Sequence, residues 1–245
     1  MNRAHRALVG AVLAALALLV GGPAQAAYNG PASAFGPASD PPASGWHIGY
    51  YTPSTPGTLS FAEASTGSGI ASLDFTMQDN TALLVTRQKA QYPTLLGDLS
   101  HDSTISTTFD ISNVTGLFTY YGEPSCGPTP QEGGIEANVR FYFQTSNSGG
   151  FDETHYWWSN PVSWPLLDPS SNGQNLTISN SLNGAFWTDY FGHSGADPLY
   201  AAGFEAAISN VTVIGMSFGG GCFFENGVGT TDGSGTFTID SFSVS

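Results

Sequence analysis

Short runs of alternating apolar and polar residues recur along this chain, and they constrain its fold more than any other feature. In residues 70–77, Ala71, Leu73 and Phe75 alternate with polar residues, and residues 104–111 repeat the pattern. A period of two places every second side chain on the same face of a β-strand. Glycine, proline and asparagine separate the runs, as tight turns require. The pattern predicts a series of short strands over most of the chain.

The composition favours the same fold class. Aromatic residues make up 13% of the chain and charged residues only 10%, whereas about a quarter is usual for charged residues. Such a chain is too aromatic to be disordered, and it is typical of β-sheet with tight turns. We therefore expect an all-β, jelly-roll-like antiparallel β-sandwich whose last strand returns beside an early one.

One segment departs from the strand pattern. In residues 198–210, Leu199, Phe204 and Ile208 lie near helical spacing, and Asp197 can cap the start. Proline at position 198 suits the first turn of a helix. The sequence predicts one short helix here, closing one end of the sandwich.

The first 26 residues have the three parts of a secretory signal peptide. A basic head is followed by an apolar run over residues 7–20 and by a small-residue end, Ala24-Gln25-Ala26. The alternative, a transmembrane anchor, needs about 20 apolar residues, more than this run has. We expect a secreted, extracellular protein with no membrane partner. Residues 27–44 then form a flexible leader of Pro, Gly, Ala and Ser, and residues 45–245 a single β-sandwich domain.

The charge balance limits the partners. Cleavage after residue 26 removes two of the five Lys and Arg residues, Arg3 and Arg6, and none of the nineteen acids. The remaining bases, Arg87, Lys89 and Arg140, cannot neutralise a row of phosphates, which argues against nucleic acid and anionic lipid. Glycans and extracellular proteins remain as partners, and the sequence leaves the oligomeric state open.

Two cysteines, Cys126 and Cys222, are present. In an exported protein an even number of cysteines predicts a disulfide, here between two Gly-rich segments. The alternative is a metal site, but neither cysteine has a CxxC partner or a nearby histidine pair.

Three segments carry a family resemblance: a Gly-rich turn entering an early strand (residues 67–73), a short connector (residues 92–99), and a helix running into a strand (residues 204–212). Their order resembles the jelly-roll modules of bacterial secreted proteins related to laminin B (laminin IV) and galactose-binding-like domains. The resemblance implies a sandwich fold and a non-catalytic binding or adhesive role, and it transfers no ligand residues.

Motifs for catalysis are weak. Gly215-Met216-Ser217-Phe218-Gly219 matches the G-x-S-x-G nucleophile elbow, but a Gly-rich stretch rather than a helix follows it, and the last histidine, His193, precedes it. The chain also lacks the Glu-x-Asp-x-x-Glu strand motif by which it would resemble the jelly-roll glycosidases. We expect no catalytic residue and no enzyme activity, with a secreted polysaccharide-active hydrolase or lyase as the alternative.

Two aromatic clusters, residues 155–158 and 186–193, suggest a carbohydrate platform, because flat rings stack on the C–H faces of sugars. Consecutive strand residues face opposite sides, so one of Trp157 and Trp158 should be exposed. The ligand-binding candidates are Tyr156, Trp157, Trp158, Trp187, Asp189 and Tyr190. The alternative is that these side chains pack the core.

Acidic turns offer a third kind of site. Asp152, Glu153 and Asp232 could supply oxygen ligands to calcium, although no EF-hand spacing supports them. We expect no cofactor, with structural calcium as the alternative. The leading hypothesis is a secreted, non-catalytic module that binds carbohydrate or another extracellular protein. A structural matrix component is a further alternative.

Overall fold

The computed structural model describes residues 44–52, 59–120, 128–146, 151–166, 175–220 and 226–245. The predicted signal peptide, nearly all of the predicted leader, Cys126 and Cys222 lie outside these ranges. The elements, in chain order, are β1 (Trp46–Tyr51), β2 (Ser60–Glu63), β3 (Ala71–Phe75), β4 (Asn80–Thr86), β5 (Thr104–Thr115), β6 (Phe118–Tyr120), η2 (Pro130–Glu132), β7 (Asn138–Gln144), η3 (Glu153–His155), β8 (Tyr156–Trp158), β9 (Trp164–Pro165), β10 (Asn175–Ser181), η5 (Gly184–Phe186), α1 (Ala201–Ile208), β11 (Val213–Gly219), β12 (Val228–Thr230) and β13 (Ser234–Val244).

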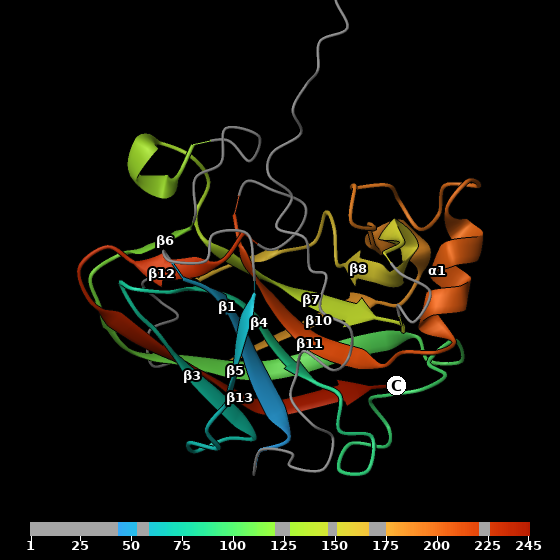
Figure 1. Cartoon of the computed structure of the whole chain (residues 1–245), viewed down its shortest axis with the longest axis horizontal. Helices are drawn as coiled ribbons and strands as arrows, with labels where there is room; N and C mark the ends of the chain where they lie inside the picture. The colour runs from blue at the N-terminus through green and yellow to red at the C-terminus, as the bar shows by residue number, and fades with distance from the viewer. Residues whose placement is uncertain (1–43, 53–58, 121–127, 147–150, 167–174, 221–225) are drawn as a thin grey trace, which may run out of the picture.

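The strands form two antiparallel sheets packed face to face, so the predicted β-sandwich is confirmed (Figure 1). The larger sheet has the order β2-β1-β4-β11-β7-β8, with β12 pairing with β4 and β6, and β9 pairing with β7. The smaller sheet has the order β10-β5-β13-β3. The last strand, β13, lies between β3 and β5, so the chain end returns beside an early strand as predicted.

The alternation seen in the sequence separates the two faces of each strand. In β5, Ile105, Phe109 and Ile111 are buried between the sheets, while Thr108 and Asp110 face outward. The outward face of the smaller sheet is lined by hydroxyl side chains, as in the contact of Thr108 with Thr177 on β10 at 2.9 Å. One face of this sheet is therefore core and the other is polar, as the pattern predicts.

The larger sheet is buried on both faces. Its inward residues, such as Phe141 and Phe143 of β7, join the core between the sheets. Its outward residues form a second apolar cluster that includes Tyr142 and Trp158. Arg140, two residues before Tyr142 on β7, is also buried on that outward face. Its Nε donates to Asn138 Oδ1 at 3.1 Å.

The predicted helix is confirmed as α1, Ala201–Ile208, which buries Phe204, Ala207 and Ile208 against the core. It lies beside β8 at one end of the sandwich, while β6 and β12 lie at the opposite end (Figure 1). Within the described ranges, no helix has both the length and the hydropathy needed to cross a bilayer.

Candidate functional site

The predicted ligand-binding residues lie in the interior of the protein. Their exposed fractions range from 0% to 4% for Tyr156, Trp157, Trp158, Trp187, Asp189 and Tyr190. A ring must present a face to solvent before it can stack on a sugar. These side chains therefore pack the core, which was the alternative interpretation. The candidate site is instead formed by the exposed rings next to them.

The buried indoles also have their N–H groups satisfied internally. Trp157 Nε1 donates to the Thr154 carbonyl at 2.7 Å, and Trp158 Nε1 donates to Ser217 Oγ at 3.1 Å. Trp187 Nε1 donates to a backbone carbonyl at 2.8 Å. Adjacent Trp157 and Trp158 do face opposite sides of β8, as expected. Both are buried because the outward face of the larger sheet is itself covered, in part by Tyr190.

A turn over residues 189–193 carries one exposed ring of the candidate site. Thr188 pairs with Trp158 through two backbone hydrogen bonds of 2.9 Å and with Ser194 on its other side. The turn thus reverses the chain at the edge of the larger sheet. Gly192 has φ of +86°, a left-handed conformation that glycine adopts without strain. Phe191, just before it, points outward and is 43% exposed.

Asp189 holds this turn from inside. Its carboxylate is fully buried, and Oδ1 accepts from the backbone N–H groups of Phe191 and His193, both at 2.9 Å. The Oδ2 atom lies 2.9 Å from His193 Nδ1. Because an ionised carboxylate only accepts hydrogen bonds, Nδ1 is the donor in this contact. The predicted candidate Asp189 is therefore a positioning residue for Phe191 and His193.

The second exposed ring, Phe151, precedes the short helix η3. Asp152 caps η3 by accepting from the backbone N–H of Thr154 at 2.9 Å and from its hydroxyl at 2.6 Å. The hydrogen bond from the Thr154 side chain is the main reason that the pKa of Asp152 lies below its usual value. Phe151 is 45% exposed and stacks on buried Tyr156 at 5.8 Å.

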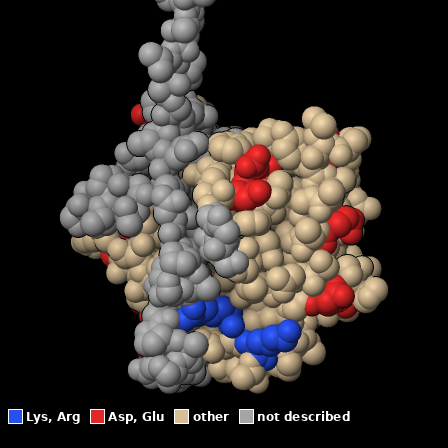
Figure 2. Space-filling view, turned by 45° about the vertical axis from the view of Figure 1, so that its right-hand side comes forward, with Lys and Arg blue, Asp and Glu red and all other residues tan. Residues whose placement is uncertain are grey.

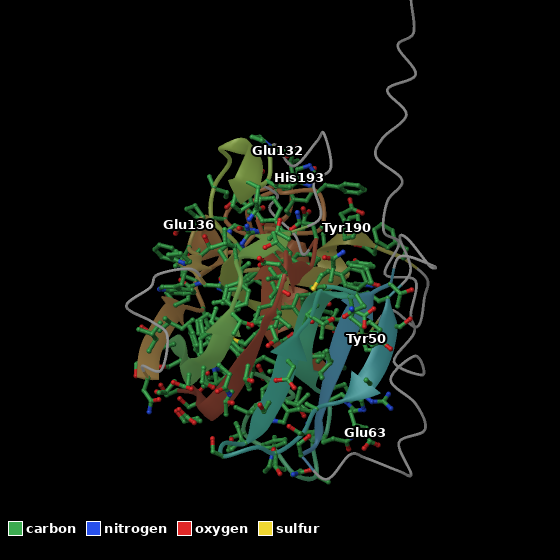
Figure 3. All side chains as sticks on the ribbon, turned by 90° about the vertical axis from the view of Figure 1, so that its left-hand side faces the viewer. Tyr50, Glu63, Glu132, Glu136, Tyr190 and His193 are labelled. Carbon is green, nitrogen blue, oxygen red and sulfur yellow. The ribbon has the colours of Figure 1, made fainter. Side chains whose placement is uncertain are left out.

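Four rings form a continuous row at the surface, which we call the aromatic patch: Phe151, Phe191, His193 and Tyr200. The ring centroids of Phe151 and Phe191 are 6.3 Å apart, and those of Phe191 and His193 are 6.2 Å apart. His193 stacks on Tyr200 at 3.9 Å with nearly parallel planes. Figure 3 shows Tyr190 and His193 near one end of the molecule, away from Tyr50 and Glu63.

Helix α1 anchors the Tyr200 end of the aromatic patch. Gly203 on α1 lies so close to the Thr154 side chain that a Cβ atom added to Gly203 would be 2.6 Å from the Cβ atom of Thr154. The helix is therefore pressed against η3, which follows Phe151. The two ends of the patch rest on elements that contact each other, and this limits their relative movement.

The predicted calcium ligands are not gathered into a site. Asp152 caps η3 and Glu153 is its first residue, whereas Asp232 lies in the turn between β12 and β13 and accepts from Thr231 at 2.9 Å. Among the residues that the structure describes, no group of three or more His, Cys, Asp or Glu side chains could hold a metal ion.

Ser217 of the G-x-S-x-G motif lies inside strand β11 rather than in a turn between a strand and a helix. It is 2% exposed and accepts the hydrogen bond from Trp158. An attacking serine needs an exposed hydroxyl beside a base. The motif is thus part of strand β11, and Ser217 is not placed as a nucleophile.

The predicted aromatic clusters, residues 155–158 and 186–193, contain Phe191 and His193 of the patch, but Phe151 and Tyr200 lie outside them, and none of the four rings was a ligand-binding candidate. Phe191 stands directly before a glycine, and Phe151 stands between glycine and aspartate. Turn residues next to each ring, on one side of Phe191 and on both sides of Phe151, interrupt the strand period, so neither ring is tied to a sheet face. That context was the available signal that these two rings, rather than the tryptophans, are exposed.

Comparisons with known proteins give limited guidance. No family model matches the chain, and no curated protein matches it. Among solved structures, the chain is similar to the family 11 carbohydrate-binding module of the cellulosomal cellulase Lic26A-Cel5E of Clostridium thermocellum. The match covers 82% of this chain and 86% of that one, with 11% identity and a TM-score of 0.36. A likeness at this level carries no argument about ligand or site, and it gives no support to the laminin IV resemblance in particular.

Proposed function

We propose that this protein is an exported, non-catalytic carbohydrate-binding module that holds a glycan against the aromatic patch. The observation that supports this proposal is the row of Phe151, Phe191, His193 and Tyr200 at the surface. Large apolar side chains gathered at the surface mark binding sites more often than isolated ones do. Export rests on the three-part segment at residues 1–26.

Aromatic rings suit a sugar because its C–H groups form an apolar face. Phe151 and Phe191 meet at 76°, so the aromatic patch is angular rather than flat. A sugar ring stacked on one phenyl group would therefore touch the edge of the other. Such an angular surface suits a chain end or a soluble oligosaccharide better than the flat surface of a crystalline polymer.

Both exposed rings are supported from below, which favours binding. Tyr190 contacts Phe151 at 5.2 Å and Phe191 at 5.3 Å, and it is itself 4% exposed. Rings that are already held in place lose little conformational freedom when a ligand arrives. The patch is in this sense preorganised.

The test is a binding screen of the mature protein against immobilised glycans, followed by single substitutions. Phe191→Ala should weaken retention about tenfold, equal to about 1.4 kcal/mol, because one stacking partner is lost. Phe186→Ala is the matched control, since Phe186 is also an exposed phenylalanine (41%) but lies on η5 outside the patch. Equal affinities for the Phe191→Ala and Phe186→Ala proteins would refute the proposed site, and retention of no glycan would refute the function.

A further inference from the structure

In the part of the sequence after position 140, the Asp, Glu, Lys and Arg positions are all acidic. Beyond Arg140 the sequence has no lysine or arginine, and the patch lies entirely within that part of the chain. Arg140 itself is 5% exposed on β7, where its Nε donates to Asn138. In Figure 2, which brings the α1 side forward, the basic side chains lie together near the lower edge, and acidic side chains lie both close beside them and higher on this face.

Acidic residues flank both ends of the aromatic patch. At the Phe151 end, Asp152 and Glu153 follow directly in the chain, and the Glu153 carbonyl accepts from the backbone N–H of Tyr190 at 3.4 Å. This contact brings the turn that carries Phe191 beside the two acids. At the other end, Asp197 lies three residues before Tyr200: its backbone carbonyl accepts from Tyr200 N at 2.9 Å, and its exposed carboxylate accepts from Leu199 N at 2.9 Å.

We propose that the aromatic patch selects a glycan that carries positively charged amino groups, such as an oligomer of glucosamine. This inference rests on the proposed function and names its ligand class. A cation is attracted to the face of an aromatic ring, and a nearby carboxylate adds a Coulombic attraction. Both features occur together here, at Phe151 with Asp152 and Glu153.

The same arrangement argues against acidic glycans. A uronic acid or sulfated sugar would meet the carboxylates of Asp152 and Glu153 next to Phe151, and the net charge of the whole chain, −14, would repel it at longer range. The two histidines of the region do not reverse this. His193 is paired with Asp189, and His155 is half-buried in η3 next to Asp152 and Glu153.

The experiment compares three soluble hexasaccharides with the same linkage: glucose, N-acetylglucosamine and glucosamine. Titration calorimetry would be run at about pH 5, which is above the ordinary carboxyl pKa of about 4, so that the acids stay ionised while the sugar amines are protonated. We expect the glucosamine hexamer to bind at least about fivefold more tightly than the other two. Raising salt from about 20 mM to about 500 mM should remove most of that difference, because it shortens the screening length.

Variants test the acids directly. Asp152→Asn with Glu153→Gln should weaken glucosamine binding about fourfold to ninefold, at about two- to threefold for each charge, and should weaken it more than glucose binding. Asn keeps one oxygen that can accept from Thr154, so η3 keeps its cap. The matched control is Glu63→Gln with Glu136→Gln, which removes two exposed acids outside the patch (Figure 3).

The possible results separate the two proposals. Equal binding of all three hexamers, with Phe191→Ala weakening each, would overturn the charge selectivity and leave the proposed function intact. If no hexamer binds and the glycan screen is also negative, both proposals fail. If a lysine hexapeptide binds as tightly as the glucosamine hexamer, the patch recognises basic peptides and the inference is overturned in favour of a protein partner.

Discussion

Replacing Asp189 by alanine should destabilise the protein by about 4–5 kcal/mol and release the turn that carries Phe191. The carboxylate is fully buried and makes three contacts of 2.9 Å, with the backbone N–H groups of Phe191 and His193 and with the His193 ring. Hydrogen bonds to charged groups contribute about 1.5–3 kcal/mol each. We use the lower end, about 1.5 kcal/mol, because the donors are only partly buried, and three such bonds give roughly 4–5 kcal/mol.

Urea unfolding followed by tryptophan fluorescence measures this loss, since the chain has five tryptophans. Asp189→Asn keeps one oxygen for the two backbone donors and should lose about half as much. Asp197→Ala is the control, because among the described residues the exposed Asp197 carboxylate accepts a hydrogen bond only from Leu199 N, worth about 1 kcal/mol or less. If Asp189→Ala costs no more than Asp197→Ala, the buried carboxylate does not hold the turn and the reasoning is refuted.

Three further predictions concern stability and ionisation. Trp158→Phe removes the donor to Ser217 and should cost about 1–3 kcal/mol in urea unfolding; an unchanged midpoint would show that the bond contributes nothing. Thr154→Val should raise the pKa of Asp152, measured by NMR titration, because the side-chain hydrogen bond to the carboxylate is lost. In the wild type this lowered pKa adds stability that is fully present above the usual carboxyl pKa and is lost as pH falls through the lowered pKa. The mutant should lack that contribution. Burial lowers the pKa of His47, so the free energy of unfolding should fall as pH drops below 6.5, the ordinary pKa of histidine. His47→Asn should flatten this dependence on pH. Parallel curves of stability against pH for the wild type and the variant would contradict the prediction.

The fold could be predicted because alternation records which face of a strand is buried. In β5 the residues that alternate in the sequence, such as Phe109 and Asp110, divide between core and surface in the structure. The helix followed from the spacing of Phe204 and Ile208, both of which are buried in α1. Local patterns sufficed here because each of these elements has one apolar side.

The exposure of the aromatic residues could not be predicted in the same way. In β8 the pattern gives opposite faces for Trp157 and Trp158, and the structure agrees, but it buries both. The outward face is covered by Tyr190, which is 32 positions from Trp158 in the chain and approaches its ring to 6.2 Å. Contacts across such a separation depend on how the chain is folded, and no local period records them.

The buried residues that sequence reasoning selected still matter to the proposed site, because they form its base. Tyr190 supports both Phe151 and Phe191, and Asp189 fixes the turn between Tyr190 and His193. A ring that rests on a packed interior keeps its orientation, whereas an exposed ring on a loose turn would lose entropy on binding. Packing and binding are therefore not alternatives for these segments. The tryptophans and Tyr190 fill the interior so that the rings at its border can stay exposed and fixed.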